Sequence, residues 1–272
     1  QRQLNTNWSS FADLQYRHVK HDMKGFQGSP GLTVSRSFDF INPKAGITYT
    51  MNGWQAFFSY ALAQKEPNRD DFQAGLTKQP KPETLHDIEV GIERKKSDYH
   101  FGANMYYMYY YNQLVLTGQI NDVGAYTRIN IPHSYRLGVE LQGGVALDKW
   151  INLSGNLAIS KNKVSSFIEC LDNYDTGDQQ AVSHQNTDIS FSPTIVAGAN
   201  IRLLPVQHIE LSLMSKYVGK QYMDNSQTET RKLNAFFVQD IRASWTIKKL
   251  FFAEWNIIGQ VNNLFDKKYE PN

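Results

Sequence analysis

A short charged run is the first group of residues that could do chemistry. Arg69 is followed at once by Asp70 and Asp71, between Glu66 and Phe72. A guanidinium presents a fork of N–H donors, so Arg69 could bind a ligand carboxylate or phosphate in a bidentate way. Alternatively, these charges pair with one another and fold the surrounding loop. The sequence leaves both interpretations open, and Arg69 and Asp70 are candidate ligand-binding residues.

Aromatic residues supply the second group of candidates. The run Tyr106–Tyr111 reads YYMYYY, and its members alternate between the two faces of a predicted strand. Tyr110 and the following Asn112 stand near the rim of that strand. Aromatic platforms suit planar catecholate or tetrapyrrole rings, so both residues are ligand candidates. Similar candidates in the next polar stretch are Tyr126, Arg128 and His133.

The sequence carries none of the short motifs typical of catalysis. Its seven histidines show no His-Glu-x-x-His spacing, and there is no Gly-x-Ser-x-Gly or phosphate-binding loop. Cys170 is the single cysteine, which excludes an internal disulfide and a multi-cysteine metal site. His18 and His21 could ligate haem iron axially, but no dedicated metal site is expected. The sequence therefore predicts neither an enzyme nor a resident cofactor.

Composition narrows the class of protein further. The chain has 272 residues and a net charge of +2, which is too mild to predict a nucleic-acid partner. No apolar run approaches the length of a transmembrane helix. The mean hydropathy of −0.50 is typical of a soluble protein. A membrane barrel gives similar values, however, because lipid-facing and lumen-facing residues alternate along each strand.

Alternation with period two runs through nearly the whole chain and predicts antiparallel strands. Residues 135–147 show it most clearly, with Leu137, Val139 and Leu141 separated by polar residues or glycine. Strands of about 9–11 residues suit a bilayer, whereas globular strands average about five or six. We predict eleven strands, at 8–19, 43–51, 54–64, 86–96, 99–115, 135–147, 151–160, 193–204, 208–220, 236–248 and 252–265.

The predicted connections alternate between short and long. The short ones are 51–53, 96–98, 148–149, 204–207 and 248–250; the long ones are 20–37, 65–85, 116–133, 164–190 and 221–235. Short periplasmic turns opposite long extracellular loops are the layout of an outer-membrane barrel. The predicted fold is therefore all-β, an antiparallel transmembrane β-barrel with about 11 strands of about 22. A soluble all-β adhesin is the alternative.

The directions of the first and last predicted strands indicate whether the chain could close a barrel by itself. The first and last predicted strands both run toward the long-loop side, and such a set of strands cannot close a barrel. We expect at least one further strand beyond Asn272. Residues 1–272 are thus expected to form a partial barrel, without a plug domain, the first half of the barrel or the last strand.

The end of the chain carries a family resemblance. Residues Val261–Tyr269 read VNNLFDKKY and resemble the NLFDKKY signature near the C terminus of TonB-dependent outer-membrane receptors. Other stretches resemble the Bacteroidetes members of this family, in the siderophore and cobalamin branch. These stretches are Asn42–Ile47, Lys65–Phe72, Pro80–Glu83, Asn112–Gly118 and Ser190–Pro193.

The resemblance implies active uptake across the bacterial outer membrane. Family members bind a scarce nutrient complex such as a ferric siderophore, haem or cobalamin in their extracellular loops. The TonB–ExbB–ExbD complex then supplies energy by pulling on an N-terminal plug. Outer-membrane lipid and lipopolysaccharide would surround the barrel, and a surface lipoprotein is a further expected partner. A glycan or oligosaccharide importer and a plugless outer-membrane pore are the alternative functions.

Overall fold

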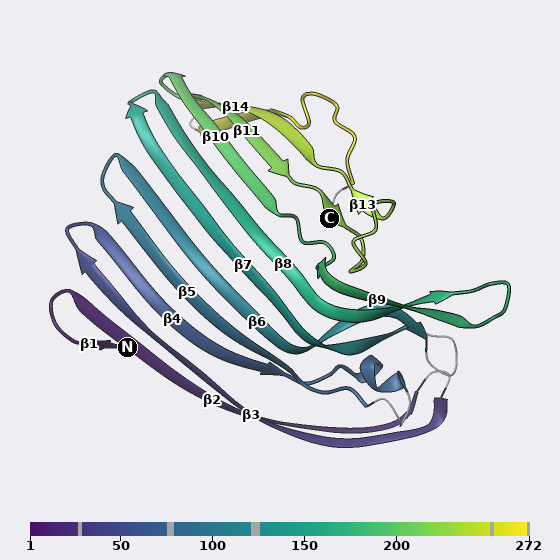
Figure 1. Ribbon diagram of the computed structural model, residues 1–272. Coiled ribbons are helices and arrows are strands. Elements are labelled where there is room, and N and C mark those ends of the chain that lie inside the picture. The colour runs from purple at the N-terminus through teal and green to yellow at the C-terminus, as the bar shows by residue number, and fades with distance from the viewer. Residues whose placement is uncertain (27–28, 75–78, 121–125, 251–252, 271–272) are drawn as a thin grey trace.

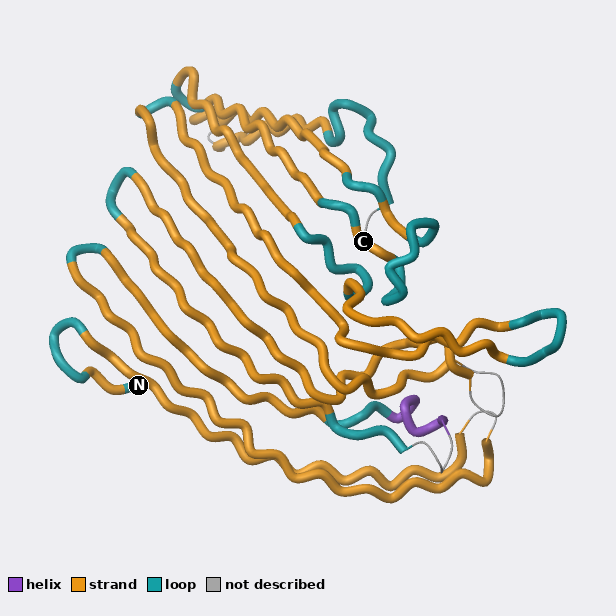
Figure 2. The backbone as a smooth tube through the Cα atoms, in the orientation of Figure 1, coloured by secondary structure: helices purple, strands orange, loops and turns teal. Residues whose placement is uncertain are grey.

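Nearly the whole chain forms one antiparallel sheet, curved like part of a barrel wall (Figures 1 and 2). The computed structural model describes residues 1–26, 29–74, 79–120, 126–250 and 253–270. The sheet runs in the order β1-β2-β3-β4-β5-β6-β7-β8-β10-β11-β14-β15, and β9 pairs with β8 beside this path. No helix within these residues is long and apolar enough to cross a membrane.

Eleven strands build the wall, as the alternation predicts. They are β2 (Trp8–Phe26), β3 (Ser29–Met51), β4 (Trp54–Lys65), β5 (Glu83–Lys95), β6 (Tyr99–Ile120), β7 (Tyr126–Asp148), β8 (Ile151–Asp172), β10 (Ile195–Val206), β11 (Ile209–Val218), β14 (Phe236–Leu250) and β15 (Ala253–Val261). The other described elements are β1 (Arg2–Gln3), β9 (Gln179–Asp188), β12 (Gln221–Tyr222), β13 (Lys232–Leu233) and the 3-10 helix η1 (Arg69–Ala74).

The short connections lie together at one end of the sheet, as predicted. Between β3 and β4, Asn52 and Gly53 have φ values of 51° and 79°. Two consecutive residues with positive φ define the tight hairpin turn that matches the twist of paired strands, and Asn-Gly is its preferred sequence. The turn between β14 and β15 includes residues 251–252, which lie outside the described residues.

The long connections are more ordered than the sequence predicts. Much of the predicted loops 20–37, 116–133 and 164–190 is strand, because β2–β3, β6–β7 and β8–β9 continue as hairpins beyond the wall (Figure 1). These stretches are rich in polar residues and glycine and carry only scattered apolar residues, such as Met23 and Phe167, so they read as loops in the sequence. Pairing nevertheless satisfies their backbone hydrogen-bonding groups, which favours strand.

We call the long-loop end the crown, and define it as the described residues of 17–40, 66–82, 112–132, 161–192 and 218–238. Every buried hydrophobic side chain that the structure describes lies in the crown. Three small cores form there: around Met23, Phe26, Val34 and Phe72; around Ile131, Val164, Phe167 and Ile189; and around Val218, Phe236 and Val238. The remainder of the wall is a single layer with apolar side chains exposed on its outer face.

The inner face of the wall is packed by aromatic rings over glycines. A Cβ at Gly91 would lie 2.2 Å from Cε1 of Phe57, and one at Gly138 would lie 2.5 Å from the hydroxyl of Tyr106. Each ring therefore fills the space that a side chain on the neighbouring strand would occupy. Rings over glycines stabilise strand pairing where glycine alone would weaken it.

Candidate functional site

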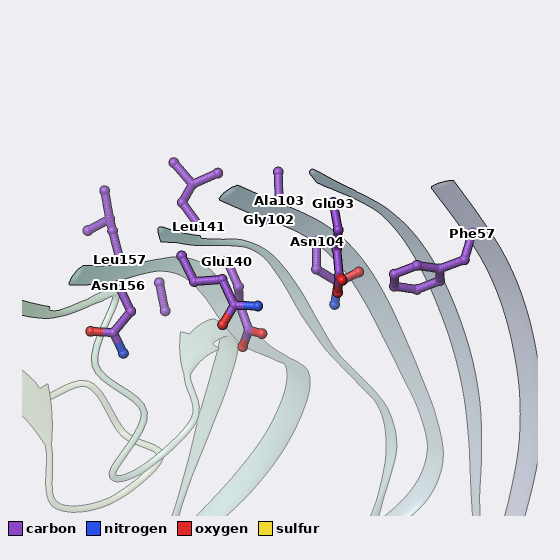
Figure 3. A pocket seen from close by; sticks show the side chains of 11 residues that line it. Phe57, Glu93, Gly102, Ala103, Asn104, Glu140, Leu141, Asn156 and Leu157 are labelled. Atoms are coloured by element: carbon purple, nitrogen blue, oxygen red, sulfur yellow. The ribbon is translucent and has the colours of Figure 1, made fainter. Parts of the chain in front are cut away.

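A polar hollow lies on the inner face of the wall across β4 to β8. Its volume is about 370 Å³. Phe57, Glu93, Asn104, Glu140 and Asn156 extend to one side of the sheet. The side chains of Ala103, Leu141 and Leu157 extend to the other (Figure 3). This separation follows from the two-residue period of the strands, which sends successive side chains to opposite faces.

The hollow is acidic. Glu93 and Glu140 line it, and no Lys or Arg is among the described residues that line it. Neither carboxylate makes an ion pair within the described part of the chain. Nearby, Asn104 donates a long 3.4 Å hydrogen bond to Glu89, and its own buried Oδ1 has no partner among the described residues. This surface suits a cationic group, such as a guanidinium, brought by another polypeptide segment.

An ion pair with a buried carboxylate holds the connection between β4 and β5 against β7. Asp71 on η1 is 2% exposed, and both of its oxygens accept hydrogen bonds from Arg128 on β7. The distances are 2.7 Å from Nε to Oδ1 and 2.7 Å from Nη2 to Oδ2. The hydrogen bonds to Asp71 raise the pKa of Arg128 above its ordinary value. Geometry of this bidentate kind fixes both side chains.

Arg69 and Asp70 lie on the same short helix. Arg69 donates from Nη2 to the carbonyl oxygen of Gly25 at 2.7 Å, and its guanidinium lies 4.9 Å from the centre of the Phe26 ring. Asp70 is close enough to Arg128 to contribute to its raised pKa. The charged run therefore folds the loop, with Arg128 rather than Arg69 as the partner of Asp71. Ligand contact by Arg69 or Asp70 stays a prediction.

Three further candidates have different surroundings. Tyr110 lies on the inner face of β6, near Arg136. Asn112 has a φ of 53°, and its carbonyl oxygen accepts a 2.6 Å hydrogen bond from the side chain of Asn130. Tyr126 begins β7, but its side chain lies outside the described part of the structure. Tyr110 and Asn112 thus remain candidates at the rim of the lumen.

His133 belongs to a belt of rings on the outer face of the wall. Its ring centre lies 5.7 Å from that of Tyr109 and 5.1 Å from that of Tyr111. Residues of the same parity on β7 include Val139 and Leu141, whose side chains are exposed on the outer face. Tyr110 and His133 therefore lie on opposite faces, so the structure does not bring these two candidates together. The belt consists of Tyr60, His86, Tyr107, Tyr109, Tyr111, His133 and Tyr135.

Sequence reasoning missed a second charged cluster in the crown. Glu169 on β8, 7% exposed, contacts His184 Nε2 through one oxygen at 2.7 Å and accepts from Arg231 Nη1 through the other at 2.8 Å. Arg231 also donates to Asp224 at 2.7 Å. Glu169 and Arg231 lie 62 positions apart, and no local spacing could have paired them. Within the described residues, no group of three His, Cys, Asp or Glu side chains could hold a metal ion.

An antiparallel wall with an apolar outer face, a polar inner face and an ordered crown defines a section of a membrane barrel. The model of a protein family described as "TonB dependent receptor-like, beta-barrel" matches residues 1–264, and this chain belongs to that family. The protein accordingly lies in the bacterial outer membrane, with short periplasmic turns and an extracellular crown. The family comprises transporters rather than enzymes.

Solved structures share the fold at low sequence identity. The siderophore receptor PiuA from Acinetobacter baumannii gives a TM-score of 0.77 at 17% identity, over 98% of this chain and 38% of that one. The copper transporter OprC gives a TM-score of 0.73 at 12% identity, over 98% of this chain and 41% of that one. The ferric yersiniabactin uptake receptor FyuA from Yersinia pestis gives a TM-score of 0.71 at 18% identity, over 98% of this chain and 39% of that one.

This chain therefore spans about two fifths of the length of these solved structures. No curated protein matches its sequence.

Proposed function

We propose that this chain is barrel wall and crown of an outer-membrane receptor that imports a scarce nutrient complex. The cargo classes are a ferric siderophore, haem or cobalamin, and the energy comes from the TonB–ExbB–ExbD complex. The ordered crown carries the proposal, because it holds buried cores and ion pairs above a polar inner wall. A simple pore needs no such scaffold, whereas a receptor must position the groups that recognise its cargo. The names of the similar structures, which include siderophore, iron and copper receptors, support it.

The acidic hollow suggests a role for the inner wall in this mechanism, as the surface that holds a plug domain. We propose that residues 1–272 are a partial barrel, and that a plug domain elsewhere in the protein docks basic side chains against Glu93 and Glu140. Such contacts would be strong but few, since charge-assisted hydrogen bonds exceed neutral ones in strength. Their small number would let the plug move when TonB pulls on it. Lipopolysaccharide around the outer aromatic belt and a surface lipoprotein at the crown are further proposed partners.

Uptake by a strain that lacks the gene tests the proposal. We expect the deletion strain to lose growth on one ferric siderophore, haem or cobalamin source, and the complete gene to restore it. Restoration should fail when the proton gradient is dissipated or TonB is deleted. Uptake that persists without TonB would indicate a plugless pore, and a defect confined to oligosaccharides would indicate a glycan importer.

A further inference from the structure

A second hollow, in the crown, points to the charge of the cargo; this inference rests on the proposed import function. The hollow has a volume of about 360 Å³. Three segments far apart in the sequence enclose it: the end of β6, the β8–β9 hairpin and the connection between β11 and β14. A site assembled from three segments can surround a small molecule on several sides, as ligand pockets generally do.

Among the described residues that line this hollow, Arg231 is the single guanidinium. Its Nη1 donates to both Glu169 and Asp224, at 2.8 Å and 2.7 Å. The hydrogen bond to Glu169 raises the pKa of Arg231, so the group stays charged. Its side chain is 38% exposed, and its other N–H groups make no hydrogen bond within the described part of the chain. Arg231 is thus held in place with donors left for an oxygen acceptor.

The carboxylates of the hollow are already engaged by protein groups. Glu169 contacts His184 and Arg231, Asp224 accepts from Ser226 and Arg231, and Asp172 accepts from Gln179 at 2.7 Å. Their charges remain, however. Among the described lining residues, three carboxylates stand against one guanidinium, so the balance of formal charge is negative. An anionic ligand would be repelled here, because charges at short range interact strongly in a partly buried site.

Apolar surface lies beside these charges. Leu116 and Tyr174, which line the hollow, are 61% and 92% exposed. Thr117 also lines it, is 3% exposed and has a hydroxyl with no partner among the described residues. The hollow therefore offers a fixed cationic donor and apolar contact area, both within a negative field.

We propose that this hollow binds the cargo and selects neutral or cationic oxygen-ligated metal chelates, of the hydroxamate type, against trianionic catecholate chelates. Each hydroxamate brings a single negative charge, so a ferric trishydroxamate core is neutral. Each catecholate brings two, so a ferric triscatecholate remains a trianion. Arg231 donates to hydroxamate oxygens, and the linking methylene chains pack on Leu116 and Tyr174. The negative balance of the hollow disfavours the trianion.

The test measures binding of two probes to the complete gene product in detergent micelles. Ferrioxamine B is the hydroxamate probe and ferric enterobactin the catecholate probe, and quenching of tryptophan fluorescence reports each Kd. We expect ferrioxamine B to bind at least about tenfold more tightly, with the preference shrinking at high salt. Tighter binding of ferric enterobactin, or binding of neither probe, overturns the inference.

Variants locate the effect in the hollow. Arg231→Gln should weaken the binding of ferrioxamine B by about tenfold, since a hydrogen bond from a charged group is lost. Asp172→Asn should strengthen ferric enterobactin several-fold, because it removes one repelling charge while keeping the side-chain shape. The matched control is Arg202→Gln, which breaks the wall pair with Glu210 and should leave both affinities unchanged. Heat-modifiable migration in electrophoresis checks that each variant is folded.

Two outcomes separate this inference from the proposed function. If the variants bind both probes as the parent does, the hollow is not the cargo site, while TonB-dependent uptake of another cargo would still support the import function. If no nutrient complex shows TonB-dependent uptake, the import function itself fails.

Discussion

Strand β6 passes through two environments along its length. In the wall, Met105 and Tyr107 are 52% and 37% exposed on the outer face. Only a few residues further on, in the crown, Leu114 and Thr117 are 8% and 3% exposed. The same strand therefore contributes to a membrane-facing surface in the wall and to a water-excluding core in the crown. Its apolar side chains are exposed in the first part and buried in the second.

The difference shows what stabilises each region. In the wall, lipid contacts the apolar outer face, so no protein core is needed there, and pairing between strands satisfies the backbone. In the crown, water surrounds the extensions, so the strands must bury apolar side chains against each other. Ion pairs such as Asp71–Arg128 then fix the position of one crown segment relative to another. The crown resembles a small soluble domain carried on a membrane wall.

The largest expected effect comes from emptying a crown core. Phe72→Ala should destabilise the crown by about 3–5 kcal/mol, because the side chain is 1% exposed and its removal leaves a cavity. Faster hydrogen exchange in β2, β3 and η1, measured by mass spectrometry, would report it. The matched control is Phe58→Ala, whose ring is 47% exposed on the outer face and should matter much less. Equal effects from both would break the distinction between crown and wall.

Breaking the buried ion pair should come next. Arg128→Ala leaves the carboxylate of Asp71 buried without its partner, which should cost about 3 kcal/mol. Limited proteolysis should then cut near η1 more rapidly. Adding Asp71→Asn to Arg128→Ala should recover part of the loss, because no buried charge then remains. A double variant as unstable as the single one would argue against this account.

A substitution in the wall should act by overpacking, because a new side chain would clash with a neighbouring ring. Gly91→Ala places a Cβ 2.2 Å from the Phe57 ring and should cost about 1–3 kcal/mol. The yield of heat-resistant folded protein in electrophoresis would measure it. Phe57→Ala in the same chain should relieve the clash, and protection of the crown against exchange should stay unchanged. Loss of crown protection in Gly91→Ala would show that the two regions are coupled.

The smallest expected effect is a pH dependence of the crown. Burial favours the neutral form of Glu66, but hydrogen bonds from its own backbone N–H and from Arg17 outweigh it and lower its pKa. A lowered folded pKa means that this stabilisation is complete above the ordinary value of 4.5 and is lost as pH falls through the lowered value. Hydrogen exchange near Glu66 should therefore quicken in that acidic range. Glu66→Gln should be less stable at neutral pH and lack this transition.

Local sequence could predict the wall because its cause is local. Alternation puts Leu137, Val139 and Leu141 on one face, and Asn52-Gly53 encodes a tight turn whatever lies around it. The crown gave weaker signals. Its strands carry mostly polar residues with only scattered apolar ones, so β2 beyond Val19 and β8 beyond Ser160 looked like loops. Candidate residues were also split between environments, since Tyr110 faces inward and His133 faces outward.

The sequence by itself determined the all-β class, the eleven wall strands and the side on which the long connections lie. These features follow from a period of two and from turn residues, which act over a few positions. Only the tertiary structure decided that Asp71 pairs with Arg128, that Glu169 holds Arg231, and that three distant segments enclose one hollow. Such partners are chosen by how the hairpins pack in the crown, and residues up to 62 positions apart leave no pattern in the sequence.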